Sequence, residues 1–297
     1  MREESLAQVH AWIEYYRDLG IHDFYRSAGA GVVGELAATA DAEEVYAPEV
    51  LPDEVVEAVS SRNPILEQTI VSHPLESPSA VSPAIRLVPF DQLAPLPAER
   101  VPLAARAAAL QAIRDEIGDC TRCPLAYAGR HKIVFADGSP AARLMFVGEG
   151  PGADEDAQGL PFVGKAGQLL NNMIGAMGLA RSDVYIANIV KCRPPGNRTP
   201  EAVEANTCSP FLLRQIDVVQ PEVIVALGST AATYLLGVKQ SLSSLRGRWH
   251  NCRGAKLAVT YHPAFLLRDP RQKAEAWKDL QMVMTQLGLT SPVRKQS

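Results

Sequence analysis

Short apolar runs alternate with amphipathic stretches through the second half of the chain. Four of these runs are short and almost wholly apolar, which predicts buried strands. Between and after them, apolar residues recur at helical spacing. Strands that alternate with helices predict βαβ units and a mostly parallel sheet covered on both faces. The predicted strands are 144–147, 184–190, 223–227 and 257–260, and the predicted helices are 102–117, 165–178, 201–218, 229–236 and 272–287.

The pattern differs in the first third of the chain. Apolar residues in 4–19 share one helical face, so we expect an amphipathic helix that docks on this chain or on a protein partner. Nine prolines then fall between residues 48 and 97, among Ala, Ser, Val and acidic residues. That composition opposes a packed core. We therefore expect an N-terminal amphipathic helix in 1–27, a disordered Pro/Ala-rich acidic linker in 28–98 and a globular domain in 99–297.

Composition places the chain among soluble globular proteins. It has 297 residues, of which 47% are hydrophobic and 21% charged. No apolar run reaches transmembrane length, and the polar start of the chain lacks the apolar core of a signal peptide. We expect a cytoplasmic protein that does not enter a membrane. Five cysteines in such a protein favour metal or redox chemistry over disulfides.

The net charge of −4 hides a division along the chain. Residues 1–100 hold 6 Lys and Arg against 17 Asp and Glu, whereas residues 101–297 hold 23 against 16. The C-terminal part is therefore mildly basic, which suits a polyanionic partner such as DNA.

The segment 148–170 has the layout of a ligand site, with a strand before it, a glycine-rich loop, and a helix after it. Ligands of α/β sheets bind at the carboxyl end of a strand, near the start of a helix. Glycine lets the backbone approach a ligand closely. The loop also carries carboxylates for acid–base chemistry and an aromatic ring for stacking. The alternative is a solvated acidic loop. The residues concerned are Glu149, Asp154, Glu155, Asp156 and Phe162.

Four cysteines form a constellation typical of a metal site. Cys120 and Cys123 make a C-x2-C pair, and Cys192 and Cys208 make a C-x15-C pair. Four thiolates can hold a tetrahedral zinc ion or a cubane iron–sulfur cluster, and the spacing alone leaves both open. Unrelated buried thiols are the alternative. Cys252 is left over as a free thiol.

Two further segments carry candidate chemistry. Asn188 precedes a stiff Pro/Gly loop with Lys191, Arg193 and Arg198, either a phosphate-facing edge or a solvated loop. In 261–268, a histidine follows the fourth predicted strand, where it can donate a hydrogen bond to developing negative charge. Two leucines after it suit an apolar wedge in DNA. The alternative there is a structural histidine with two core leucines.

Together these stretches resemble the family-4 (type IV) uracil-DNA glycosylases, the iron–sulfur branch of the uracil-DNA glycosylase superfamily. The resemblance spans about 105–290 and implies a three-layer α/β/α fold around a four-stranded, mostly parallel sheet. It implies a structural 4Fe-4S cluster on Cys120, Cys123, Cys192 and Cys208. It also implies hydrolysis of the N-glycosidic bond of deoxyuridine in DNA, which leaves an abasic site for base excision repair. The matching segments are 148–152, 160–170, 188–200, Cys208 and 262–268.

The chemistry of uracil excision gives these side chains expected roles. A base must leave the stack before its glycosidic bond is reachable. Leu266, with Leu267, would fill the gap, and Phe162 would stack on the flipped ring. Asn188 would read the uracil edge and reject cytosine, because an amide offers both a donor and an acceptor. His262 would stabilise the leaving uracil anion.

Glu149 is the expected activator of water, with Asp154 and Asp156 in reserve. Relatives in the superfamily's first family carry Asp and Tyr where this chain has Gly150 and Gly152. The chain also lacks the basic insertion of the covalently trapping relatives, so we expect turnover. The expected substrate contacts are Gly148, Gly150, Gly152, Phe162, Asn188, His262, Leu266 and Arg268.

Two other classes of protein stay open. One is a non-catalytic iron–sulfur module that binds DNA or a polymerase, and the other is an electron-transfer or zinc-stabilised protein. The joint presence of Glu149, Phe162, Asn188 and His262 favours the enzyme. We expect a monomer that acts on uracil in single- or double-stranded DNA.

Overall fold

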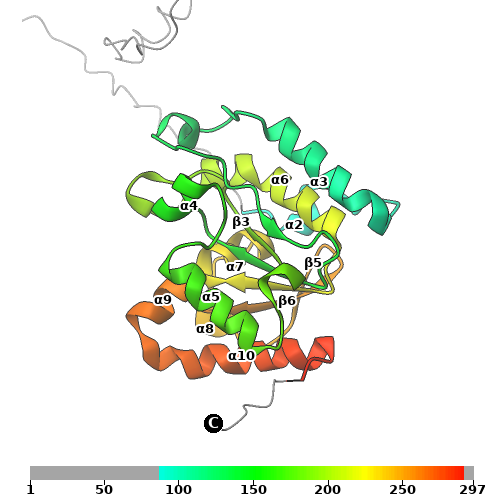
Figure 1. Cartoon of the computed structure of the whole chain (residues 1–297), viewed down its shortest axis with the longest axis vertical. Helices are drawn as coiled ribbons and strands as arrows, with labels where there is room; N and C mark the ends of the chain where they lie inside the picture. The colour runs from blue at the N-terminus through cyan, green and yellow to red at the C-terminus, as the bar shows by residue number, and fades with distance from the viewer. Residues whose placement is uncertain (1–86, 291–297) are drawn as a thin grey trace, which may run out of the picture. The chain divides into compact units, whose positions relative to one another are not determined.

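A six-stranded mixed sheet lies at the centre of the part of the chain that the structure describes, residues 87–290 of a computed structural model (Figure 1). Four parallel strands form its middle in the order β3, β2, β4, β6. The short strands β1 and β5 pair antiparallel at the two edges. The four predicted strands are confirmed, and the edge strands add to them. The strands are β1 Asp137–Gly138, β2 Leu144–Gly148, β3 Tyr185–Asn188, β4 Val223–Leu227, β5 His250–Cys252 and β6 Ala255–Thr260.

Helices cover both faces of this sheet. Successive side chains of a strand point to opposite faces. In β2, Met145 and Val147 pack into the core beneath α3, α6 and α7, whereas Leu144 and Phe146 pack against α5 and α10. Figure 1 shows α3 and α6 on one side of the sheet and α5 and α10 on the other. The predicted three-layer α/β/α architecture is confirmed.

The helices that build these layers are those the periodicity predicted, together with several short ones. Each long helix begins and ends within two residues of the predicted range. No helix within 87–290 has both the length and the apolar character needed to cross a membrane. The α-helices are α2 Phe90–Leu93, α3 Leu103–Ile117, α4 Ala153–Gln158, α5 Lys165–Ala176, α6 Ala202–Val219, α7 Gly228–Leu236, α8 Leu242–Leu245, α9 Pro263–Arg268 and α10 Lys273–Leu287, and the 3-10 helices are η1 Pro124–Tyr127, η2 Arg181–Asp183, η3 Pro195–Asn197 and η4 Pro270–Gln272.

The segment that leads into α3 packs on the domain. Phe90 of α2 is fully buried in the core. The buried Arg253 side chain donates to the carbonyl oxygens of Ala94 and Pro95 and pairs with Asp217, while its backbone N–H donates to Asp91 at 2.5 Å. The folded unit therefore includes residues 90–95, which the sequence analysis assigned to the linker.

Two predictions fall outside the described residues. These are the amphipathic helix in 4–19 and the linker over 28–86. Both stay predictions.

Candidate active site

A cleft of about 840 Å³ opens at the carboxyl end of the parallel sheet. Each of the four parallel strands ends at this edge, and the residue at its end or just after it lines the cleft: Glu149 after β2, Asn188 at the end of β3, Gly228 after β4 and Tyr261 after β6. Ligands of open α/β sheets bind at this edge, beyond the strand ends. The fold therefore gathers residues far apart in the sequence into one site.

Glu149 is half-buried on the wall of the cleft. The hydroxyl of Thr230, on α7, donates a hydrogen bond of 2.5 Å to its Oε2. This bond engages one of the two carboxylate oxygens. The sequence analysis missed Thr230, because a lone threonine inside an apolar helix gives no signal of its own.

Asn188 is a buried amide whose Oδ1 has no hydrogen-bond partner within residues 87–290. A Cβ placed on Gly148 would collide with this Oδ1 and would lie 2.6 Å from Cζ of Phe162. Only glycine at position 148 leaves room for both side chains. Burying an acceptor without a partner costs free energy, and Asn188 also lines the cleft, so its amide is a candidate for contact with a ligand.

The rings of Phe162 and His262 pack against each other in the lining of the same cleft. Their ring centroids are 5.6 Å apart and the planes are inclined by 33°. Phe162 is buried and holds a left-handed backbone, φ 52°, which is unusual for a bulky residue. Arg181 holds it there by donating to the carbonyl oxygens of Phe162 and Pro161, at 3.1 and 2.6 Å.

His262 is held in one protonation state. Its Nδ1 accepts a hydrogen bond of 3.1 Å from the backbone N–H of Ala264, so Nδ1 carries no proton. Burial, with the nearby Arg268 cation, lowers the pKa of His262 to about 4. The neutral ring therefore carries its proton on Nε2, which is a hydrogen-bond donor at physiological pH. The sequence analysis had left this protonation state open.

The acidic loop divides into one free and two structural carboxylates. Glu155 accepts from the backbone N–H groups of Gly152, Val163 and Gly164 and so closes the glycine-rich loop. Asp156 is fully buried and bonded to residues 131–132, which makes it unfit as a reserve activator of water. Asp154 is exposed and lines the cleft.

The structure corrects the expected wedge. Leu266 is 1% exposed and belongs to the interior of α9, whereas Leu267 is 43% exposed. The expectation that Leu266 enters DNA is wrong, and Leu267 is the leucine that α9 presents to solvent. Arg268, next to it, is exposed and lines the cleft as expected. Gly150 and Gly152 also line it, while Gly148 lies behind Asn188 and Phe162.

Lys191 does not belong to a phosphate-facing edge. It is 1% exposed, and its Nζ donates to the carbonyl oxygen of Asn188 at 2.9 Å and to Oε1 of Gln215 at 2.6 Å. Burial lowers the pKa of Lys191 to about 8. Arg198 lines the cleft but pairs with the buried Glu204.

The four predicted metal-binding cysteines line one small cavity on another side of the domain. All are free thiols. Burial raises the pKa of Cys123, Cys192 and Cys208, the last to about 12. Within residues 87–290, no three His, Cys, Asp or Glu side chains close around a point that would hold a single ion.

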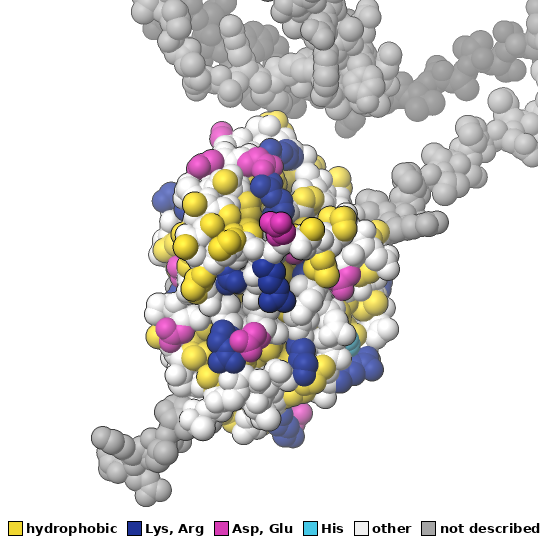
Figure 2. All heavy atoms as spheres, turned by 90° about the vertical axis from the view of Figure 1, so that its right-hand side faces the viewer, with side chains coloured by type: hydrophobic (Ala, Val, Ile, Leu, Met, Phe, Trp, Pro, Cys, Tyr) yellow, Lys and Arg dark blue, Asp and Glu magenta, His cyan; other side chains and the backbone are white. Residues whose placement is uncertain are grey.

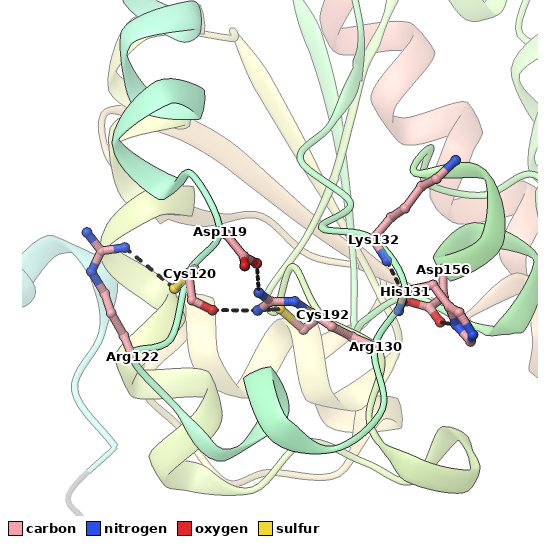
Figure 3. A network of polar contacts seen from close by, with 8 residues as sticks. All are labelled: Asp119, Cys120, Arg122, Arg130, His131, Lys132, Asp156 and Cys192. Atoms are coloured by element: carbon pink, nitrogen blue, oxygen red, sulfur yellow. Dashed lines mark hydrogen bonds and ion pairs between the residues drawn. The ribbon is translucent and has the colours of Figure 1, made fainter. Parts of the chain in front are cut away.

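Cationic and backbone donors surround these sulfur atoms. Arg130 donates to Cys192 Sγ at 3.4 Å and Arg122 donates to Cys120 Sγ at 3.5 Å (Figure 3). The Lys191 backbone N–H donates to Cys208 Sγ at 3.3 Å. Donors of this kind stabilise thiolates against the cost of burial. The donor set therefore fits an anionic four-thiolate group.

Comparison with known proteins places this architecture in a family. Residues 135–281 match the uracil DNA glycosylase superfamily. A type-4 uracil-DNA glycosylase of Thermotoga maritima is 45% identical over 162 residues, which are 54% of this chain and 84% of the relative. One of Pyrobaculum aerophilum is 42% identical over 181 residues, 58% of this chain and 92% of the relative. At that identity and coverage, the chain belongs to the type-4 uracil-DNA glycosylases of the uracil DNA glycosylase superfamily.

Proposed function

We propose that this protein removes uracil from DNA by hydrolysing the N-glycosidic bond of a flipped deoxyuridine, which leaves an abasic site for base excision repair. The observation that carries the proposal is the orphan Oδ1 of Asn188 in a cleft bounded by Phe162 and His262. Uracil offers a donor at N3 and an acceptor at O4, and an amide side chain complements both. Cytosine presents the reverse pattern and leaves the buried amide unsatisfied.

Phe162 and His262 have different proposed roles toward the base, stacking and hydrogen bonding. The Phe162 ring offers a face on which the flipped base stacks. His262 donates from Nε2–H to uracil O2, where negative charge develops as the glycosidic bond breaks. A neutral donor fixed in place serves this role without rearranging in the transition state.

Glu149 is the proposed group for water on the sugar side. Thr230 fixes one of its carboxylate oxygens, so the other accepts a hydrogen bond from water and directs it to the sugar carbon. Leu267 is the proposed wedge that fills the gap left by the flipped base, since it is exposed on α9 next to the cleft-lining Arg268.

The cysteine site is proposed to hold a 4Fe-4S cluster on Cys120, Cys123, Cys192 and Cys208. The four thiols line one cavity, and a 4Fe-4S cluster takes four thiolate ligands. Bound there, the cluster supplies a cross-link between the segment before β1 and the start of α6. Arg122, Arg130 and the Lys191 amide hold the thiolates.

The proposal also covers the cellular location, the oligomeric state and the form of the DNA substrate. A cytoplasmic setting suits a chain whose five cysteines are all free thiols. We propose that the protein acts as a monomer on single- or double-stranded DNA.

A cleavage assay tests the proposal. Wild-type holoprotein should convert a uracil-containing oligonucleotide into an alkali-labile product. Asn188→Ala should lose about 100-fold or more in rate, as removal of a preorganised active-site contact does. The matched control is Asn206→Ala, an exposed asparagine on α6, which should keep the wild-type rate.

Two outcomes would contradict the proposal. If wild-type protein with its cofactor intact leaves the oligonucleotide uncut, the chain is a non-catalytic DNA-binding module. If metal analysis of the purified protein finds zinc without iron and sulfide, the assignment of a cluster is wrong and the cysteines form a zinc site.

A further inference from the structure

A short segment of the chain touches both the cysteine site and the glycine-rich loop of the cleft. Arg130 donates to the carbonyl oxygen of Cys120 at 2.6 Å and to Cys192 Sγ at 3.4 Å, and it also pairs with Asp119. The next two residues lie against Asp156 of α4 (Figure 3). Three consecutive residues therefore link the two sites: Arg130 contacts the cysteine site, and His131 and Lys132 contact α4 through Asp156.

Asp156 is fully buried and uses both oxygens on this segment. Its Oδ1 accepts from the backbone N–H of His131 at 2.8 Å and of Lys132 at 3.2 Å, and its Oδ2 accepts from Nδ1 of His131 at 2.6 Å. Burial by itself would raise the pKa of Asp156, but these hydrogen bonds outweigh it, so the pKa is lowered and the carboxylate stays ionised.

The neighbouring residue on α4 faces the other way. Glu155 accepts hydrogen bonds from the backbone N–H groups of Gly152, Val163 and Gly164, at distances of 2.9 to 3.1 Å, and Gly152 and Gly164 line the cleft. Two consecutive carboxylates thus fasten the six-residue α4 on two sides. The helix has no apolar stripe, so polar contacts and not core packing set its position.

We propose that Asp156 is a positioning residue that couples the cysteine site to the uracil cleft, by pinning α4 to the segment 130–132. This inference rests on the proposed function and its cofactor. In it, the thiol-bound group fixes Arg130, residues 131–132 hold Asp156, and α4 then holds Glu155 where it closes the loop that carries Phe162.

The first test is kinetic. Asp156→Ala removes all three acceptor contacts and should lower kcat about 10- to 100-fold with little change in KM, since a displacement of about 1 Å costs up to that much. Asp156→Asn keeps an oxygen for the two backbone donors and should restore most of kcat. The matched control Asp115→Ala, an exposed carboxylate on α3, should behave as wild type. Folded Asp156→Ala protein with wild-type kcat, or no rescue by asparagine, would overturn the proposal.

The second test is amide hydrogen exchange, which does not depend on uracil. In Asp156→Ala holoprotein, the amides of Gly152, Val163 and Gly164 should exchange faster than in wild type, while those of β4 stay protected. His131→Ala, which removes one contact from a side chain that is 74% exposed, should have a smaller effect and fold normally. Equal protection in all variants would refute the positioning role.

The third test addresses the coupling itself. Removing the cofactor from wild-type protein should speed exchange at Gly152, Val163 and Gly164, and removing it from Asp156→Ala should add nothing, because the connection is already broken. Additive effects would show that the two sites are independent. If exchange behaves as expected but wild-type protein does not cleave uracil-DNA, the positioning role stands and the proposed function fails.

Discussion

At the scale of single residues, backbone groups determine the tautomer and the position of the side chains that line the cleft. The Ala264 N–H fixes the proton of His262 on Nε2, and Gly148 makes room for Asn188 and Phe162. The sequence indicated Asn188, Phe162 and His262 from their motifs, but it did not indicate the proton position or Thr230. Those depend on contacts between residues far apart in the chain, which no local pattern encodes.

His262 makes stability depend on pH. Its folded pKa of about 4 lies below the ordinary value, so the unfolded chain binds this proton first as the pH falls. Stability from this group is complete above about pH 6.5 and is lost towards pH 4, at up to about 1.4 kcal/mol per pH unit. Urea unfolding of wild type and His262→Gln at pH 7 and pH 5 should show wild type losing more stability. Parallel losses in the two proteins would contradict a histidine that is neutral in the folded state.

Gly148 should tolerate no side chain. Gly148→Ala places a methyl group against Asn188 Oδ1 and Phe162, so we expect uracil excision to fall about 100-fold, because the two groups proposed to bind the base would be displaced. Gly175→Ala is the control, since a Cβ there meets nothing within 4 Å. It lies in α5 and should keep activity and gain about 0.5–1 kcal/mol of stability. A Gly148→Ala enzyme with the wild-type rate would show that the cleft is not the base pocket.

At the scale of elements, the four parallel strands and the long helices could be predicted because burial on both faces and helical spacing leave clear patterns. The strands β1 and β5 are too short for any periodicity. Helix α4, Ala153–Gln158, has no apolar stripe and is set by the contacts of Glu155 and Asp156. Adjacent leucines on α9 could not be assigned to the core or to solvent until the orientation of the helix was known.

The two leucines of α9 should therefore differ in their effects. Leu267→Ala removes an exposed side chain and should slow excision from double-stranded DNA more than from single-stranded DNA, because only the duplex has a stack to fill. Leu266→Ala opens a cavity in the core and should cost about 2–5 kcal/mol of stability. Activity on both substrates and urea unfolding check both expectations. An equal loss on the two substrates for Leu267→Ala would exclude the wedge.

At the scale of the whole molecule, net charge gave only a coarse prediction of a DNA partner. Much of the arginine in the basic part is engaged in ion pairs, for example Arg143 with Glu222 and Arg246 with Asp279. The face seen in Figure 2 mixes Lys and Arg with Asp and Glu and does not form one basic surface. Lys165 and Arg268 line the cleft, so we expect DNA binding to depend on these cations more than on overall charge.

The packing of α2 on the domain makes truncations informative. Removing residues 1–86 should leave the packing of α2 and the excision rate as in the full chain, because Phe90 and the α2-side partners of Arg253 are all retained. Removing residues 1–97 also removes Phe90 and the Asp91, Ala94 and Pro95 contacts of Arg253, and should cost about 3–5 kcal/mol for the lost aromatic side chain alone. Thermal unfolding and the cleavage assay on both truncated proteins measure this. Equal stability of the two would show that residues 87–97 contribute nothing to the fold.

The orphan oxygen of Asn188 has a consequence for turnover. An unsatisfied buried acceptor costs the resting protein about 1–3 kcal/mol. If Asn188 reads the uracil edge as proposed, the free base would relieve that cost just as the substrate does. The unsatisfied hydrogen bond that would favour substrate binding would therefore also favour retention of the product. Such an enzyme would discriminate well between bases but release its product slowly, so we expect free uracil to inhibit it.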